Sequence, residues 1–240
     1  MRYVRQILIF SAVFLISATV LGSDYTAYFK AVQNAYADYR MALFQSNQGR
    51  SIEARDSMEQ FLDKWNAILD KYLDDPPCIF AEDPLWSKSL TEVKSIMQQG
   101  LSAAEADDLS HAHEIIERIR DVLGELRHRN HVVAFSDYVN KYHTQMEYII
   151  NVFGSEDNYS QQERQSLREA LAVLQYLGKE MEANAPARYS SDPRFSELMN
   201  TNFDAINQVA SSLNSPESLQ LKNAIKRLKP AFSMLFINYG

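Results

Sequence analysis

The residues best suited to chemistry are five histidines, and all of them lie between positions 111 and 143. Histidine is the commonest metal ligand in proteins, and its unperturbed side chain titrates close to neutral pH. Such crowding in a chain of 240 residues predicts one functional region near the middle of the chain. The five are His111, His113, His128, His131 and His143.

Two short motifs in this region have the spacing of metal ligands on a helix. Side chains three or four residues apart share one helix face. Inward His, Glu and Met side chains are the ligands from which helical bundles build metal and haem sites. The predicted ligands, for a transition metal or for haem iron, are His111, His113 and Glu114 in the segment HAHE, and His143, Met146 and Glu147 farther along.

A surface position is the alternative for each of these histidines. The segment HAHE directly follows the polar stretch AEADDLS, where side chains typically cap a helix start. His128 and His131 alternate with Arg127 and Arg129, a pattern typical of a solvated basic patch. Both interpretations remain open at the level of sequence.

The chain lacks the signatures of the common catalytic sites. It contains no G-x-S-x-G elbow, no H-E-x-x-H zinc helix, no glycine-rich phosphate loop and no paired Glu-x-x-His set. Cys78 is the single cysteine, so neither an internal disulfide nor a C-x-x-C-H haem attachment can form. We therefore predict a protein that is not an enzyme.

The N-terminus has the pattern of a secretory signal peptide. Arg2 and Arg5 precede an uncharged apolar run from Ile7 to Leu21, which the small residues Gly22 and Ser23 follow. A run of this length is short for a membrane span, so we expect cleavage after residue 23, a periplasmic or secreted location and no membrane segment thereafter. The formal net charge of −7 opposes binding to nucleic acid.

Apolar residues recur at intervals of three and four along most of the chain, which is typical of amphipathic helices. Glycine and proline are scarce, with seven of each. The pattern predicts an all-α fold of about eight helices. The apolar stripes span residues 25–39, 58–72, 86–97, 112–126, 135–153, 167–181, 195–209 and 224–235.

A shift of 109 positions aligns the two halves of the chain. It pairs Asp83-Pro84 with Asp192-Pro193 and places further proline, aromatic and apolar residues opposite one another. We therefore predict a tandem duplication of antiparallel helical bundles, residues 24–131 and 132–240, behind the signal peptide 1–23. The boundary segment ELRHRNHVVAFSDYV has no helix breaker, so its two helices form one continuous helix unless the chain turns near Asn130.

Helix-capping residues support several of these boundaries. Asp83 and Asp192 each precede a proline, as N-cap residues do, and Ser160 with Glu163 forms the pattern of a capping box. If the halves are equivalent, alanine at Asp83 and at Asp192 should cause equal losses of stability.

These features predict an exported, periplasmic, non-enzymatic helical binding protein. Its partner would be a metal, haem or a small ligand near the central histidines. The alternative is a protein-interaction or scaffolding module of the cell envelope that carries no cofactor.

Overall fold

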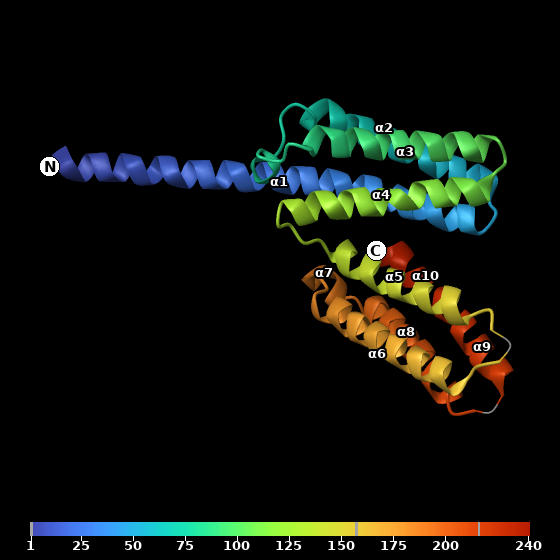
Figure 1. Ribbon diagram of the computed structural model, residues 1–240. Helices are drawn as coiled ribbons and strands as arrows, with labels where there is room; N and C mark the ends of the chain where they lie inside the picture. The colour runs from blue at the N-terminus through green and yellow to red at the C-terminus, as the bar shows by residue number, and fades with distance from the viewer. Residues whose placement is uncertain (1, 157, 216) are drawn as a thin grey trace. The chain divides into compact units, whose positions relative to one another are not determined.

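The computed structural model describes residues 2–156, 158–215 and 217–240, with side chains from Asp24 onward. These residues form helices and no strand, which confirms the all-α prediction (Figure 1). The chain divides into two compact units, unit 1 from Met1 to Val132 and unit 2 from Val133 to Gly240. The predicted signal peptide, residues 1–23, lies outside the described side chains.

Unit 1 is built from four long helices. Each helix packs on the next, and α4 also packs on α1 (Figure 1). Its core is aromatic: Phe61 and Trp65 stack with their ring centroids 5.4 Å apart, and the indole N–H of Trp65 donates to the Leu90 carbonyl at 2.9 Å. The elements are α1 (Arg2–Asn47), α2 (Ser51–Tyr72), the short 3-10 helix η1 (Cys78–Phe80), α3 (Trp86–Glu105) and α4 (Leu109–Arg129).

Unit 2 contains a comparable series of elements. Its core lies between α5, α6, α8 and α10, and α9 packs on α8 and α5. Buried Asn202 ties this core together, since its amide donates to the carbonyls of Leu198 and Ala231. The elements are α5 (Phe135–Phe153), α6 (Gln161–Ala183), α7 (Ala187–Ser190), α8 (Pro193–Ser212), α9 (Ser218–Lys226) and α10 (Leu228–Tyr239).

The continuous helix considered for the boundary segment is wrong, because α4 ends at Arg129 and α5 begins at Phe135. His131 has a φ of 55°, and the N–H of Val132 reaches back to the Arg127 carbonyl at 2.9 Å. This is the geometry of a helix C-terminus closed by a left-handed residue, a place that glycine usually takes. Histidine is not a residue type that indicates the end of a helix, so the sequence did not predict the turn at His131.

The last predicted helix is divided in the structure. Helix α9 ends at Lys226 and α10 begins at Leu228, so residues 224–235 do not form one helix. Pro230 explains the break, because it has no N–H to donate to Lys226 and its ring excludes that carbonyl. The described part of the chain therefore has helices α1 to α10, where eight were expected.

Among the helices of the described residues, none has both the length and the apolar character that a membrane crossing requires.

Candidate functional site

The predicted ligands of α4 do not converge. Exposed His111 and Glu114 bring their nearest side-chain atoms only to 4.0 Å. His113 turns instead toward Glu117, with 3.6 Å between Nε2 and Oε1. Glu117 in turn forms an ion pair with buried Arg120. Sequence reasoning missed Glu117, although it stands four residues after His113 on the same face.

The second predicted set also provides a pair rather than a cluster. His143 Nε2 lies 3.6 Å from Glu147 Oε1, and the Lys229 ammonium lies 3.0 Å from the same oxygen. Met146 is fully buried in the core of unit 2. The cation that faces Glu147 in this structure is therefore a lysine side chain.

Within the described residues, no group of three or more His, Cys, Asp and Glu side chains is placed to hold a metal ion. The pairs His111 with Glu114, His113 with Glu117, and His143 with Glu147 offer two ligands each. A structural zinc site takes four ligands. The metal or haem site remains a prediction, and these pairs would need further ligands to build one.

His113 has a structural partner in unit 1. Its Nδ1 lies 2.9 Å from the hydroxyl of buried Ser46, which donates its own proton to the Leu43 carbonyl at 3.1 Å. Which of the two groups donates in this pair depends on the tautomer of His113. The hydrogen bond fastens the end of α1 to the start of α4.

Replacing Ser46 with alanine should therefore lower the free energy of unfolding of unit 1 by about 1 kcal/mol, the usual net worth of a hydrogen bond. Urea unfolding followed by tryptophan fluorescence measures this loss, because Trp65 and Trp86, the two tryptophans, both lie in unit 1. Ser110→Ala, at an exposed position of α4, serves as the control. Equal unfolding energies for the two variants would exclude a stabilising role for the Ser46 hydrogen bond.

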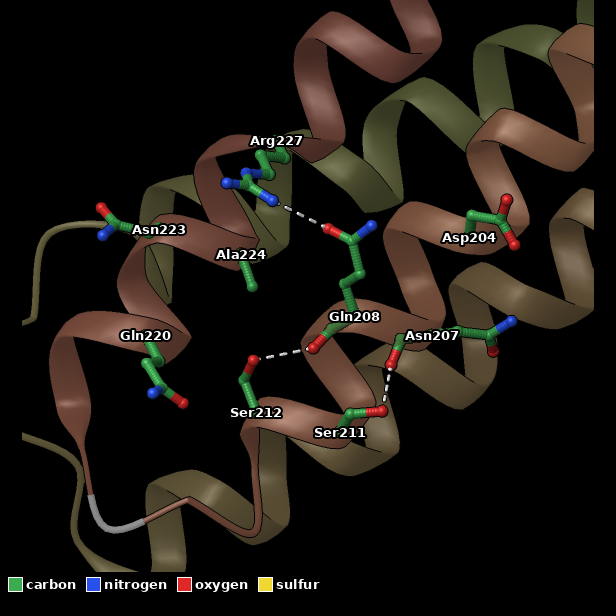
Figure 2. Close-up of a pocket in the computed structure, with 9 residues that line it drawn as sticks. All are labelled: Asp204, Asn207, Gln208, Ser211, Ser212, Gln220, Asn223, Ala224 and Arg227. Carbon is green, nitrogen blue, oxygen red and sulfur yellow. Dashed lines mark hydrogen bonds between the residues drawn. The ribbon is translucent and has the colours of Figure 1, made fainter.

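A polar groove lies between α8 and α9, with a volume of about 620 Å³ (Figure 2). In Figure 2, Gln208 and Ser212 project from α8 on one side, with Gln220 and Ala224 from α9 on the other. Eight of its nine lining side chains are polar, so the groove is suited to hydrogen bonding. The nine are Asp204, Asn207, Gln208, Ser211, Ser212, Gln220, Asn223, Ala224 and Arg227.

The aligned halves differ at one helix contact next to this groove. In unit 1, α3 meets α4 at Gly100, where a Cβ would come within 2.2 Å of the Ile116 Cγ2. At a shift of 109, Val209 and Ile225 take these two positions, and both are fully buried. A valine keeps neighbouring helix backbones farther apart than a glycine does. We attribute the open space between α8 and α9 to this substitution.

Hydrogen bonds within the groove separate its donors from its acceptors. The Arg227 guanidinium donates to Gln208 Oε1 at 3.2 Å, which leaves the amide nitrogen of Gln208 as the donor of that side chain. Toward the loop, the Gln220 amide nitrogen donates to Glu217 at 2.7 Å, and the Ser212 hydroxyl donates to the Gln208 carbonyl at 2.8 Å. The oxygens of Gln220 and Ser212 are the acceptors there (Figure 2).

The charge around the groove is unlike that of the whole chain. Residues 218–240 carry four basic residues and no acidic one, although the chain has a formal net charge of −7. Asp204 is the acidic residue of the groove lining, and its carboxylate points away from Arg227 and Gln208 (Figure 2). The end of the groove at Arg227 therefore presents positive charge.

Sequence reasoning missed this groove because it sought histidines and carboxylates, and the groove is lined mainly by amides and hydroxyls. Three of the groove residues recur in the first half of the chain. At a shift of 109, Gln99, Ser102 and Arg118 are identical to the groove residues Gln208, Ser211 and Arg227. None of the six is buried, so core packing does not explain the identities.

The described residues thus form an all-helical protein with a polar groove in its second unit. No protein-family model, curated protein or solved structure matches the chain.

Proposed function

We propose that this chain is an exported, non-enzymatic binding protein that holds a small polar ligand in the groove between α8 and α9. The observation that carries the proposal is the groove itself, about 620 Å³ lined by eight polar side chains and Ala224. Its volume lies within the range of known small-molecule sites. Export rests on the basic and apolar pattern of residues 1–23.

Binding without catalysis is favoured by the state of the hydroxyls in the groove. Ser211 donates to the Asn207 carbonyl at 2.9 Å, and Ser212 donates to the Gln208 carbonyl at 2.8 Å. A catalytic serine needs a general base that accepts its proton. Both hydroxyl protons are instead directed to main-chain carbonyls of α8, an arrangement that suits recognition.

We further propose that units 1 and 2 are copies of one ancestral bundle. The contacts of Asp83 and Asp192 support this. Each accepts a backbone N–H two residues later at 2.9 Å. Each also accepts a hydrogen bond from a side chain 47 positions later, Asn130 in unit 1 and Tyr239 in unit 2.

The buried positions of α3 and α8 support the same proposal. At a shift of 109, every buried residue of α3 from Trp86 to Ala104 falls on a buried residue from Phe195 to Leu213. The shift also superimposes the starts of η1 and α7, and the starts of α4 and α9. Two unrelated bundles would have no reason to share these positions.

Units 1 and 2 would then have diverged in function after the duplication. Unit 1 would be the structural copy, because Gly100 lets α3 and α4 pack closely there. Unit 2, with Val209 and the break at Pro230, would be the copy that binds. Loss of close packing between two helices would turn a fully packed bundle into one with a ligand-binding site.

Filling the groove should abolish binding. Ala224 is nearly buried at the floor of the groove, so Ala224→Trp places an indole in the ligand's space. We expect low-molecular-mass extract from the cell envelope to shift ¹H–¹⁵N signals of α8 and α9 in the wild type but not in Ala224→Trp. Ala172→Trp, on the exposed face of α6, is the control and should respond like the wild type. Shifts absent from the wild type, or retained by Ala224→Trp, would refute the proposed site.

A further inference from the structure

We infer that the ligand of this groove is a hydroxylated carboxylate, a sugar acid of the hexuronate kind. The inference rests on the proposed function and adds the chemical class of the ligand. It follows from the separation of donors and acceptors in the groove, from the charge around Arg227, and from a difference between Arg227 and its counterpart in unit 1.

The donor end of the groove fits a carboxylate. A guanidinium has five N–H donors in a fixed planar fork that matches the two oxygens of a carboxylate. Arg227 gives one of its donors to Gln208 at 3.2 Å, and this bond holds the guanidinium over the groove (Figure 2). The amide nitrogen of Gln208, on the side of the amide group away from Arg227, adds further donors (Figure 2). A carboxylate at this end would meet N–H groups from both side chains.

The acceptor end fits hydroxyl groups. One N–H of the Gln220 amide donates to Glu217, and the single Ser212 proton donates to the Gln208 carbonyl, so the oxygens of both side chains and the second N–H of Gln220 are left for a ligand. A ligand must then bring donors to this end. Neighbouring hydroxyls of a sugar ring are such donors, and they also accept hydrogen bonds from amide groups. A ligand with its carboxylate at Arg227 and its hydroxyls at Gln220 satisfies both ends.

The charge around Arg227 favours an anion over a neutral sugar. At a shift of 109, Arg227 corresponds to Arg118 of α4. Glu114 and Asp121 stand one turn before and one turn after Arg118, where they offset its charge. The residues that flank Arg227 at these positions are the uncharged Asn223 and Pro230. The neighbours of Arg227 along its own helix therefore do not offset its charge, and the acidic residue of the groove lining is Asp204 on α8.

Isothermal titration of the full exported protein with sodium D-glucuronate tests the inference. We expect saturable binding that Arg227→Gln weakens by about tenfold or more, since a charge-assisted bidentate contact is lost. Gln220→Leu should weaken binding less. Arg118→Gln removes the corresponding arginine of unit 1 and should bind like the wild type. Circular dichroism of each variant verifies that its fold is retained.

Two further probes separate the parts of the inference. D-glucose lacks the carboxylate and acetate lacks the hydroxyls, so each should bind at least tenfold more weakly than glucuronate. Glucose binding as tight as glucuronate, with no effect of Arg227→Gln, would overturn the sugar-acid class and leave the groove proposal standing. No binding of glucuronate would also overturn it, while the envelope-extract experiment with Ala224→Trp decides the groove proposal separately.

Discussion

Replacing Gly100 with alanine is expected to lower the free energy of unfolding of unit 1 by about 2 kcal/mol, the usual cost of overpacking a core. The new Cβ would stand 2.2 Å from the Ile116 Cγ2, closer than two carbon atoms can lie. Ile116 is fully buried, and the branch at its Cβ makes the side chain stiff in a helix. Relief therefore requires α3 and α4 to separate.

Gly124→Ala is the matched control for this prediction. Gly124 is also helical, on α4, but a Cβ there would have no neighbouring atom within 4 Å. Alanine should stabilise α4 by about 0.5–1 kcal/mol through its better helix propensity. Urea unfolding followed by tryptophan fluorescence reports both values. Two glycine-to-alanine changes in packed helices of the same unit should thus have opposite signs.

The Gly100 result bears directly on the groove. If Gly100→Ala were as stable as the wild type, α3 and α4 would tolerate a side chain at their contact. The contrast between Gly100 and Val209 would then no longer explain why a groove lies between α8 and α9.

Replacing Asp83 with alanine should cost unit 1 about 2–3 kcal/mol, because several donors would lose one buried acceptor. The Asp83 side chain is 2% exposed and lies 3.1 Å from the Arg129 guanidinium. Its oxygens also accept from the Asn130 amide at 2.7 Å and from the Leu85 N–H at 2.9 Å. The same urea unfolding experiment measures the loss.

Asp192→Ala is the counterpart in unit 2 and should cost less. Asp192 caps α8 through the Arg194 N–H and accepts from Tyr239, but within the described part of the chain it has no ion pair like the one between Asp83 and Arg129. The sequence predicted equal losses of stability for Asp83→Ala and Asp192→Ala if the halves were equivalent, whereas the contacts in the structure predict a larger loss for Asp83→Ala. Far-UV circular dichroism follows this variant, because unit 2 has no tryptophan. Equal losses would mean that the contacts of Asp83 with α4 contribute nothing.

Lowering the pH should remove the contribution of the Asp83 carboxylate to the stability of unit 1. Burial raises the pKa of Asp83, but hydrogen bonds from Asn130, Leu85 and Arg129 outweigh it and hold this pKa below its ordinary value of 3.8. The stability that Asp83 contributes is thus full above pH 3.8 and is lost as the pH falls toward its folded value. Unit 1 of Asp83→Ala should lose less stability between pH 5 and pH 3 than unit 1 of the wild type.

Helix class and several boundaries could be predicted from the sequence, because they depend on local patterns. The capping box of Ser160 with Glu163 forms as expected, and Asp192 caps α8 with Pro193 in its first turn. Asp83 was expected to do the same, but α3 begins at Trp86 after a turn. Asp83 still accepts the Leu85 N–H at 2.9 Å, and its carboxylate also binds Arg129 and Asn130 of the chain after α3.

The parts that could not be predicted depend on contacts between helices. A left-handed histidine at position 131 ends α4, and nothing in its residue type indicates that role. The histidines interact with residues of other helices. His113 contacts Ser46 of α1, and the Glu147 that faces His143 pairs with Lys229 of α10. The groove depends on how closely α8 and α9 pack, which a hydrophobic stripe does not encode. Patterns along one helix cannot give the distance to the next.

A crystal structure of the protein soaked with sodium D-glucuronate tests the proposed ligand and the proposed duplication most directly. We predict two units that superimpose at a shift of 109 residues, with the sugar acid between α8 and α9 and its carboxylate on Arg227. No ligand should lie between α3 and α4. Glucuronate bound elsewhere with the groove vacant, or two units whose helices do not superimpose, would contradict this prediction.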